Sequence, residues 1–245
     1  MPPPGSRPRA ETILLSVESL STVSAEVVSC RACPRLVEWR ETVARTKRAA
    51  YRNEDYWGRP VPGFGDPGAR VLIVGLAPAA HGGNRTGRIF TGDRSGDWLF
   101  ASLYRCGFAN QPHSHHRGDG LTLRSAYIAA AVRCAPPNNR PTPVERDTCL
   151  PFLAREVAIL KDLRVLVALG SFAWDAVLRI LPVGARRPRP RFGHGADAII
   201  GSLTVIGCYH PSQQNTFTGK LTEAMLDAVF ARARALAELP RVRLA

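Results

Sequence analysis

Residues 70–83 read RVLIVGLAPAAHGG, an apolar run that passes directly into a loop of small residues. The run shows no polar alternation, which is typical of a strand buried on both faces of a parallel sheet. Three further runs share this character, at residues 127–132, 164–169 and 203–208. Helical patterns lie between and after them, at residues 97–106, 143–163, from 171 onward and 220–239. Strands alternating with helices predict a doubly wound α/β fold on four mainly parallel strands.

One of these helices has a clear start signal. Thr142 stands where a helix cap is expected, Pro143 suits the first helical position, and Glu145 completes the capping-box pattern. This places the beginning of the helix directly after the polar stretch PPNNRPT.

The composition indicates a globular protein with an anionic partner. The chain has 245 residues, 45% of them hydrophobic, and a formal net charge of +13. Such a charge favours nucleic acid, with an anionic membrane surface as the alternative. No apolar stretch is long enough to span a bilayer, and the Pro/Arg-rich start does not read as a signal peptide. We therefore expect a disordered tail at residues 1–12, one domain at residues 13–240, and a cytoplasmic, nucleoid-associated monomer without membrane contact.

Unusual loops follow three of the four expected strands. They read GLAPAAHGG after the first, RCAPPNNRPTP after the second and YHPSQQN after the fourth. Ligands of open α/β sheets bind at the carboxyl ends of the strands. The three loops therefore predict a functional site at that edge.

Four cysteines form two pairs, Cys30 with Cys33 in C-x2-C spacing and Cys134 with Cys149 in C-x14-C spacing. Disulfides are uncommon in the cytosol, so four thiolates indicate a zinc site or an iron–sulfur cluster. The spacing alone does not separate these two, and four unrelated thiols are the alternative. A metal there would fasten the N-terminal segment to the domain.

An arginine-rich loop, VGARRPRPR at residues 183–191, contains no acid. It offers a phosphate-contacting element, and a solvated surface loop is the alternative. Its candidate DNA-binding residues are Arg186, Arg187, Arg189 and Arg191.

Taken together, the stretches at residues 63–93, 132–143 and 209–215 and the four cysteines resemble family 5 (B-type) uracil-DNA glycosylases of the uracil-DNA glycosylase superfamily. The resemblance implies a three-layer α/β/α sandwich around a short, mainly parallel four-stranded sheet. It implies a structural [4Fe–4S] cluster held by Cys30, Cys33, Cys134 and Cys149. It also implies hydrolysis of the N-glycosidic bond of a deaminated base, uracil and also hypoxanthine, in DNA.

A flipped base needs an aromatic face and a backbone that approaches closely. By resemblance, Phe90 is the stacking aromatic, although an ordinary core position is the alternative. The small residues of the first loop allow the main chain to line the pocket, with Gly75, Leu76 and Ala77 as its wall.

Two polar groups expected from related families are replaced by methyl groups, at Ala77 and at Ala130. Asn138 or Asn139 is the candidate replacement contact, and either also suits a turn. Fewer readers of the base edge imply looser selectivity, because an unpaired buried polar group is what rejects a wrong ligand.

For catalysis we expect Asp93 to orient or activate water and His210 to donate to the base carbonyl. A helix N-cap is the alternative role of Asp93. His81 is a third candidate, for the base, the sugar, a phosphate or the loop itself.

The loop after His210 is expected to meet the duplex and to fill the space left by the flipped base. Its candidate DNA-binding residues are Ser212, Gln213, Gln214 and Asn215. A zinc-stabilised, non-catalytic nucleic-acid-binding protein is the competing function. A nucleotide-binding enzyme is disfavoured, since the first loop has neither a GxGxxG nor a Walker pattern.

Overall fold

The computed structural model describes residues 18–182 and 189–238, which contain one mixed sheet of six strands in the order β1-β3-β2-β4-β6-β5. The four central strands pair in parallel, while both edge strands pair antiparallel with their neighbours. The strands are β1 (Phe64–Gly65), β2 (Val71–Gly75), β3 (Ala126–Ala130), β4 (Val165–Leu169), β5 (Asp197–Ile200) and β6 (Leu203–Cys208). The expected tail at residues 1–12 and the candidates Arg186 and Arg187 lie outside the described residues.

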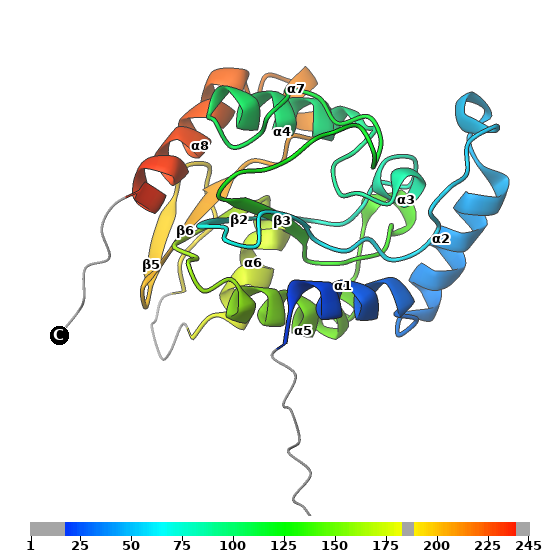
Figure 1. Cartoon of the computed structure of the whole chain (residues 1–245), viewed down its shortest axis with the longest axis horizontal. Coiled ribbons are helices and arrows are strands. Elements are labelled where there is room, and N and C mark those ends of the chain that lie inside the picture. Colours follow the sequence, from blue (N-terminus) through cyan, green and yellow to red (C-terminus); the bar gives the residue numbers. More distant parts are fainter. Residues whose placement is uncertain (1–17, 183–188, 239–245) are drawn as a thin grey trace, which may run out of the picture.

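Helices cover both faces of this sheet, which confirms the three-layer α/β/α sandwich (Figure 1). Ile73 and Val167 pack in one core beneath α4 (Arg94–Arg105) and α8 (Glu223–Glu238). Leu72 and Leu166 face the other side, beneath α5 (Pro143–Ile159) and α6 (Ser171–Ile180), with α1 (Leu20–Ser29) beside α5. Successive side chains of a strand point to opposite faces, so a continuous apolar run fills both cores.

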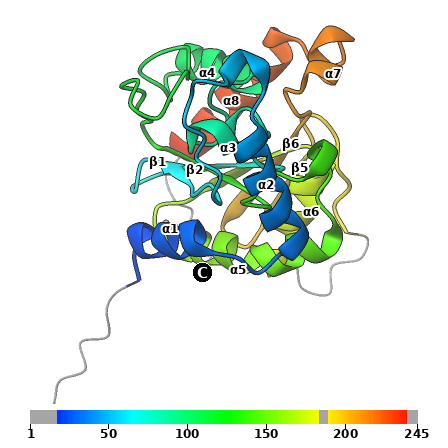
Figure 2. The ribbon, with the colours of Figure 1, turned by 90° about the vertical axis from the view of Figure 1, so that its right-hand side faces the viewer.

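Shorter elements gather at one end of the sandwich. Figure 2 shows α2 (Pro34–Thr46) across the ends of the layers, with α3 (Gly83–Thr86) behind it. Leu36 of α2 packs against Val132, which follows β3, so α2 covers the carboxyl edge of the central strands. The remaining short helices are η1 (Ala49–Tyr51), η2 (Pro137–Asn139) and α7 (Gln213–Phe217).

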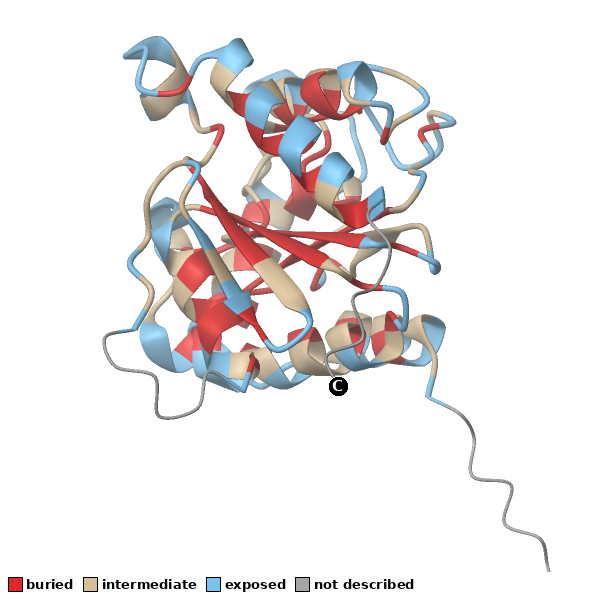
Figure 3. Cartoon of the chain, turned by 90° about the vertical axis from the view of Figure 1, so that its left-hand side faces the viewer, coloured by how far each residue is buried: buried red, intermediate tan, exposed pale blue. Residues whose placement is uncertain are grey.

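The sheet has two more strands than the sequence predicts, both at its edges. β1 is two residues long, and β5 alternates in burial from the exposed Asp197 to the buried Ile200. Figure 3 shows the contrast between the buried central strands and this half-exposed edge. An edge strand is covered on fewer sides, so it lacks the continuous apolar run that identifies the central strands.

The helix start predicted at Thr142 and Pro143 is present. Thr142 accepts from the backbone N–H of Glu145 while the Glu145 side chain accepts from the backbone N–H of Thr142, which completes the capping box. Asp93 caps α4. In the part of the chain that the structure describes, none of the helices has the length and apolar character needed to cross a membrane.

Candidate active site

The three predicted loops meet at the carboxyl edge of the sheet. Beyond the ends of β2 and β3, the Ala131 N–H donates to Gly75 O at 2.9 Å and the Val132 N–H donates to Leu76 O at 3.1 Å. These bonds continue the parallel pairing into the loops, so the backbone of the first motif is held in register with the second.

Phe90 and His210 lie together at this edge. Their ring centroids are 5.8 Å apart and their planes are tilted by 34°. A Cβ added at Gly75 would lie 2.8 Å from the Phe90 ring, so the ring occupies the space that any side chain there would need. Phe90 is 5% exposed and has a φ of 52°, a left-handed conformation that is costly for a bulky residue. The surrounding fold therefore holds this ring in a place it would not adopt by itself.

The residue His210 is half-buried, and desolvation of its imidazole lowers the pKa of the ring to about 4. The ring is therefore neutral at physiological pH and carries one N–H donor. Asn215 donates from Nδ2 to His210 O at 2.9 Å, so its side-chain amide holds the histidine backbone. The structure thus gives Asn215 a contact inside the protein that the sequence does not reveal.

Asp93 uses its two carboxylate oxygens differently. Oδ1 accepts from the Gly96 N–H at 3.0 Å, which is the N-cap role considered above. A Cβ added at Gly82 would lie 2.0 Å from Oδ2, so this second oxygen lies against the glycine of the first motif. Desolvation raises the pKa of Asp93 to about 6. The Asp93 side chain therefore caps α4 with one oxygen and places the other, in a carboxyl group with a raised pKa, beside the first motif.

A buried arginine that the sequence reasoning missed joins these parts. Arg85 donates from Nε to His81 O at 2.7 Å, from Nη2 to Gly92 O at 2.9 Å and from Nη1 to Glu54 Oε2 at 2.5 Å. It thereby ties the first motif to the residue directly before Asp93. Two of its three acceptors are backbone carbonyls, which leave no signal in a sequence.

His81 belongs to the same loop and points to a further partner. Its Nδ1 is hydrogen-bonded to the Tyr56 hydroxyl at 3.0 Å, and the two rings meet edge to face. Desolvation, with Arg48 and Arg85 nearby, lowers the pKa of His81. These contacts fit a role in holding the loop.

The remaining candidate base-contacting residues are Ala77, Asn138 and Asn139. Ala77 packs against Leu36, Val132 and Cys134, toward the cysteines. Asn138 and Asn139 are exposed in η2 with φ values of 52° and 55°, left-handed conformations that Asn tolerates.

Candidate DNA-contacting residues surround α7. Gln213 and Gln214 are exposed, and Ser212 precedes the helix as its cap residue. Phe217, 67% exposed, lies beneath the guanidinium of Arg94 at 5.0 Å and was not anticipated from the sequence. Of the arginine-rich loop, Arg189 and Arg191 are described, and both are exposed.

The four paired cysteines line one small pocket, with walls from Leu36, Val132 and Phe152. Arg40 also lines it: Nη1 donates to Cys134 Sγ at 2.9 Å, and Nε has no hydrogen-bond partner among the described residues. The Arg133 N–H donates to Cys149 Sγ at 3.4 Å. As the side chains stand over residues 18–182 and 189–238, however, no three of His, Cys, Asp or Glu are grouped to hold a metal ion.

Comparisons with known proteins identify the family of the chain. A family model described as the uracil DNA glycosylase superfamily matches residues 62–234. Relatives named type-5 uracil-DNA glycosylase are 55% identical over 221 residues in Mycobacterium tuberculosis and in Mycobacterium leprae, covering 89% of this chain and 82% and 96% of those proteins. One from Thermus thermophilus is 50% identical over 214 residues, covering 87% of this chain and 96% of the relative.

Proposed function

The chain belongs to the uracil-DNA glycosylase superfamily, and from that premise we propose that it excises uracil from DNA and leaves an abasic site. The observation that carries this proposal is the meeting of the Phe90 ring, the neutral His210 and the perturbed Asp93 at the carboxyl edge of the sheet. An aromatic face, an uncharged donor and a carboxylate are the groups that removal of a flipped base requires.

Binding begins with extrusion of the nucleotide, because a base within the stack is out of reach. The Phe90 ring offers the stacking face, and the backbone of Gly75, Leu76 and Ala77 forms the adjacent wall. The absence of a side chain at Gly75 supports this arrangement, since it is what allows the ring to lie there. Asn138 and Asn139, exposed on the loop after β3, supply a polar contact from the neighbouring side.

Cleavage of the glycosidic bond leaves its electron pair on the base and positive charge on the sugar. His210 donates its N–H to the base carbonyl, where negative charge develops. Its low pKa supports a neutral donor, which stabilises this charge without first having to be protonated.

Asp93 acts on the sugar side. With a pKa of about 6 it is largely ionised at pH 7 and above, so it stabilises the positive sugar and orients the attacking water. The second carboxylate oxygen, which does not cap the helix, performs this role. His81 keeps the first motif in place through Tyr56.

DNA contacts are assigned to the half-buried Ser212 and to the exposed Gln213, Gln214, Arg189 and Arg191. Asn215 is better placed to hold His210 than to enter the duplex, given its bond to the His210 carbonyl. Ala130 stands where related families have an Asn that reads the base edge, and the loss of that reader supports a wider range that includes hypoxanthine.

We further propose a [4Fe–4S] cluster at Cys30, Cys33, Cys134 and Cys149. Four thiols around one pocket, with N–H donors to two sulfurs and an unpartnered buried Nε on Arg40, fit such a group. When bound, it would crosslink the α1–α2 connection to the β3–α5 region and so contribute to folding. Visible absorbance together with equal iron and sulfide content tests this, and a stoichiometric zinc content would contradict it.

The excision itself is tested with a duplex carrying one uracil, under single-turnover conditions, followed by alkaline cleavage of abasic sites. We expect a cut at the uracil position, and a second substrate with hypoxanthine tests the wider range. Binding without any abasic product would instead support the non-catalytic nucleic-acid-binding protein.

A further inference from the structure

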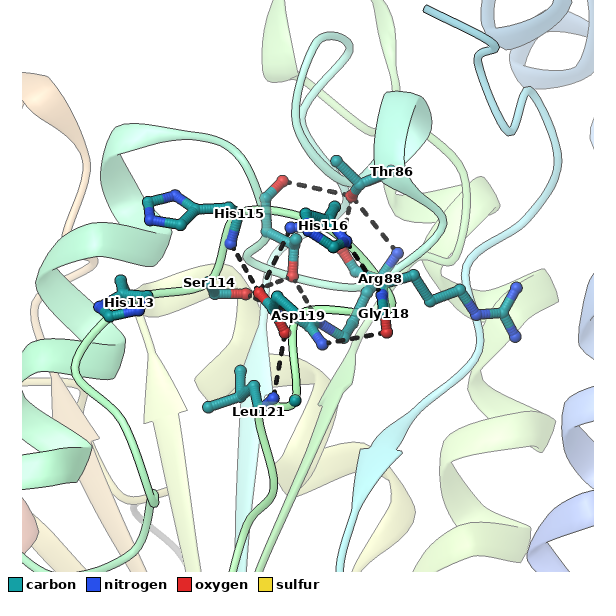
Figure 4. A network of polar contacts seen from close by, with 12 residues as sticks. Thr86, Arg88, His113, Ser114, His115, His116, Gly118, Asp119 and Leu121 are labelled. Carbon is teal, nitrogen blue, oxygen red and sulfur yellow. Dashed lines mark hydrogen bonds and ion pairs between the residues drawn. The ribbon is translucent and has the colours of Figure 1, made fainter.

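One loop has no part in this mechanism, yet a network of buried hydrogen bonds and an ion pair holds it in place. Residues 113–117 read HSHHR and are called here the histidine loop. Ser114 is fully buried, while the other four side chains are exposed. Figure 4 shows the polar network that surrounds the loop.

The inner side of the network is centred on Asp119, the only acid between residues 110 and 120. Its carboxylate accepts from Arg88 Nη2 at 2.7 Å and from the backbone N–H groups of His115, His116 and Leu121 at 2.8, 3.3 and 3.1 Å. The side chains of Arg88 and Asp119 are only 4% and 6% exposed. Removing two charges from water costs desolvation free energy, so this buried ion pair is weak evidence for added stability. We interpret the pair as fixing the conformation of the loop.

The loop is also joined to the candidate active site. The Gly92 N–H donates to Ser114 O at 2.9 Å, and the hydroxyls of Thr91 and Ser114 are 2.7 Å apart. Arg88 Nε donates to Thr91 Oγ1 at 2.9 Å. Thr91 and Gly92 lie between Phe90 and Asp93, so the histidine loop forms part of the rim of the site.

The outer side presents three histidine rings and the guanidinium of Arg117. The rings of His113 and His115 stack at 4.9 Å with planes 19° apart, and the Arg117 guanidinium lies 4.7 Å over the Trp57 ring. The histidine loop itself contains no acid, and Arg88 engages the neighbouring Asp119, so no free carboxylate between residues 110 and 120 opposes an incoming phosphate. Imidazole and guanidinium N–H groups are suitable donors to phosphate oxygens.

We propose that the histidine loop binds the phosphodiester backbone of the DNA strand beside the extruded nucleotide. The strand must pass over the rim of the site when its nucleotide enters the pocket, and the Arg88–Asp119 pair holds the loop in its path. This inference rests on DNA being the substrate, so wild-type excision of uracil is measured in the same series.

The test measures binding to a duplex that carries one non-hydrolysable 2′-fluorinated deoxyuridine, over a range of salt concentrations. The variants are the double substitution His113→Ala/His115→Ala and the single Arg117→Gln. Arg124→Gln is the matched control, since Arg124 is exposed but precedes β3 at the opposite edge of the sheet. Thermal unfolding confirms that each variant is folded.

We expect the Kd to rise about 5-fold for the double variant and for Arg117→Gln, and the salt slope of Arg117→Gln to fall by about one unit. The single-turnover rate at saturating enzyme should stay at the wild-type level. A Kd and salt slope equal to those of Arg124→Gln would overturn the proposal, as would a slower rate with unchanged Kd. Loss of uracil excision in the wild type would instead contradict the proposed function.

Discussion

Two buried arginines, Arg85 and Arg40, hold neighbouring regions at the carboxyl edge of the sheet. They differ in how many of their donor nitrogens have a hydrogen-bond partner. Arg85 donates from all three of its nitrogens to acceptors within the protein, around the candidate active site. Arg40 donates to Cys134 Sγ and Cys30 O, but its Nε is unpartnered among the described residues. The candidate active site is therefore preorganised by the chain itself, whereas the cysteine pocket retains a donor for a further acceptor.

The two regions also touch. Asn84, fully buried in α3 beside Arg85, donates from Nδ2 to the backbone carbonyl of Arg40 at 3.1 Å. A disturbance of the cysteine pocket that moves α2 would therefore reach the first motif. Substitutions on either side test how far the two regions are independent.

The largest effect is expected from the cysteine pocket. Cys134→Ala removes a proposed ligand, so iron and visible absorbance should be lost and the free energy of unfolding should fall by at least about 3 kcal/mol. Cys106→Ser is the control, because Cys106 lies outside the pocket and packs against the core below α4. Iron content and chemical denaturation decide the matter; a Cys134→Ala protein with full iron content would exclude Cys134 as a ligand.

The next effect concerns the active site alone. Asp93→Asn should lower the single-turnover rate about 100-fold, because it removes the charge that acts on the sugar and water. Asn is as good an N-cap as Asp, so thermal stability should change little. Asp97→Asn, which alters an exposed acid one turn away, is the control. A near-wild-type rate in Asp93→Asn would show that this carboxylate is not catalytic.

A smaller effect is expected from a substitution at Gly75, against which the Phe90 ring packs. Gly75→Ala places a Cβ 2.8 Å from the Phe90 ring, so the ring must shift. We expect about a 10-fold slower excision from misplacement of the base and about 1–2 kcal/mol of destabilisation from overpacking. Gly68→Ala, whose Cβ would come no closer than 3.4 Å to any neighbour, is the control. If Gly75→Ala and Gly68→Ala excise uracil at the same rate, the Phe90 ring does not stack on the base.

The last expected effect is a pH dependence with opposite signs for rate and stability. Asp93 must ionise to act, so the single-turnover rate should rise with pH and reach half its plateau near pH 6. The pKa is raised above its ordinary value of 3.8, so the folded state binds the proton more tightly between about pH 4 and 6. The contribution of Asp93 to the free energy of unfolding therefore decreases as pH rises through that window. Both dependences should vanish in Asp93→Asn, whereas His210, with its pKa of about 4, stays neutral over most of this range.

The sequence predicts the centre of the molecule better than its edges. The parallel strands β2, β3, β4 and β6 are recognisable because each is a continuous apolar run buried on both faces. β1 and β5 are not, since one is two residues long and the other alternates with solvent. The location of the site at the strand ends followed from topology, and Phe90 and His210 do meet there.

The hydrogen bonds that support the candidate site could not be predicted from the sequence, for a physical reason. Arg88 and Asp119 are separated by 31 residues, and Arg85 is held largely by backbone carbonyls. Such bonds depend on the folded path of the chain and not on the identity of adjacent residues. The second role of Asn215, toward the His210 carbonyl, was missed for the same reason.

The contact between Gly75 and the Phe90 ring also constrains how the sequence can evolve. Any side chain at Gly75 collides with the ring, while a smaller residue at Phe90 would give up the proposed stacking face and the contact with His210. The left-handed backbone at Phe90 adds a preference for glycine or asparagine that the ring overrides. Each position thus influences which substitutions the other tolerates, so we expect linked replacements of this pair to be tolerated better than single ones.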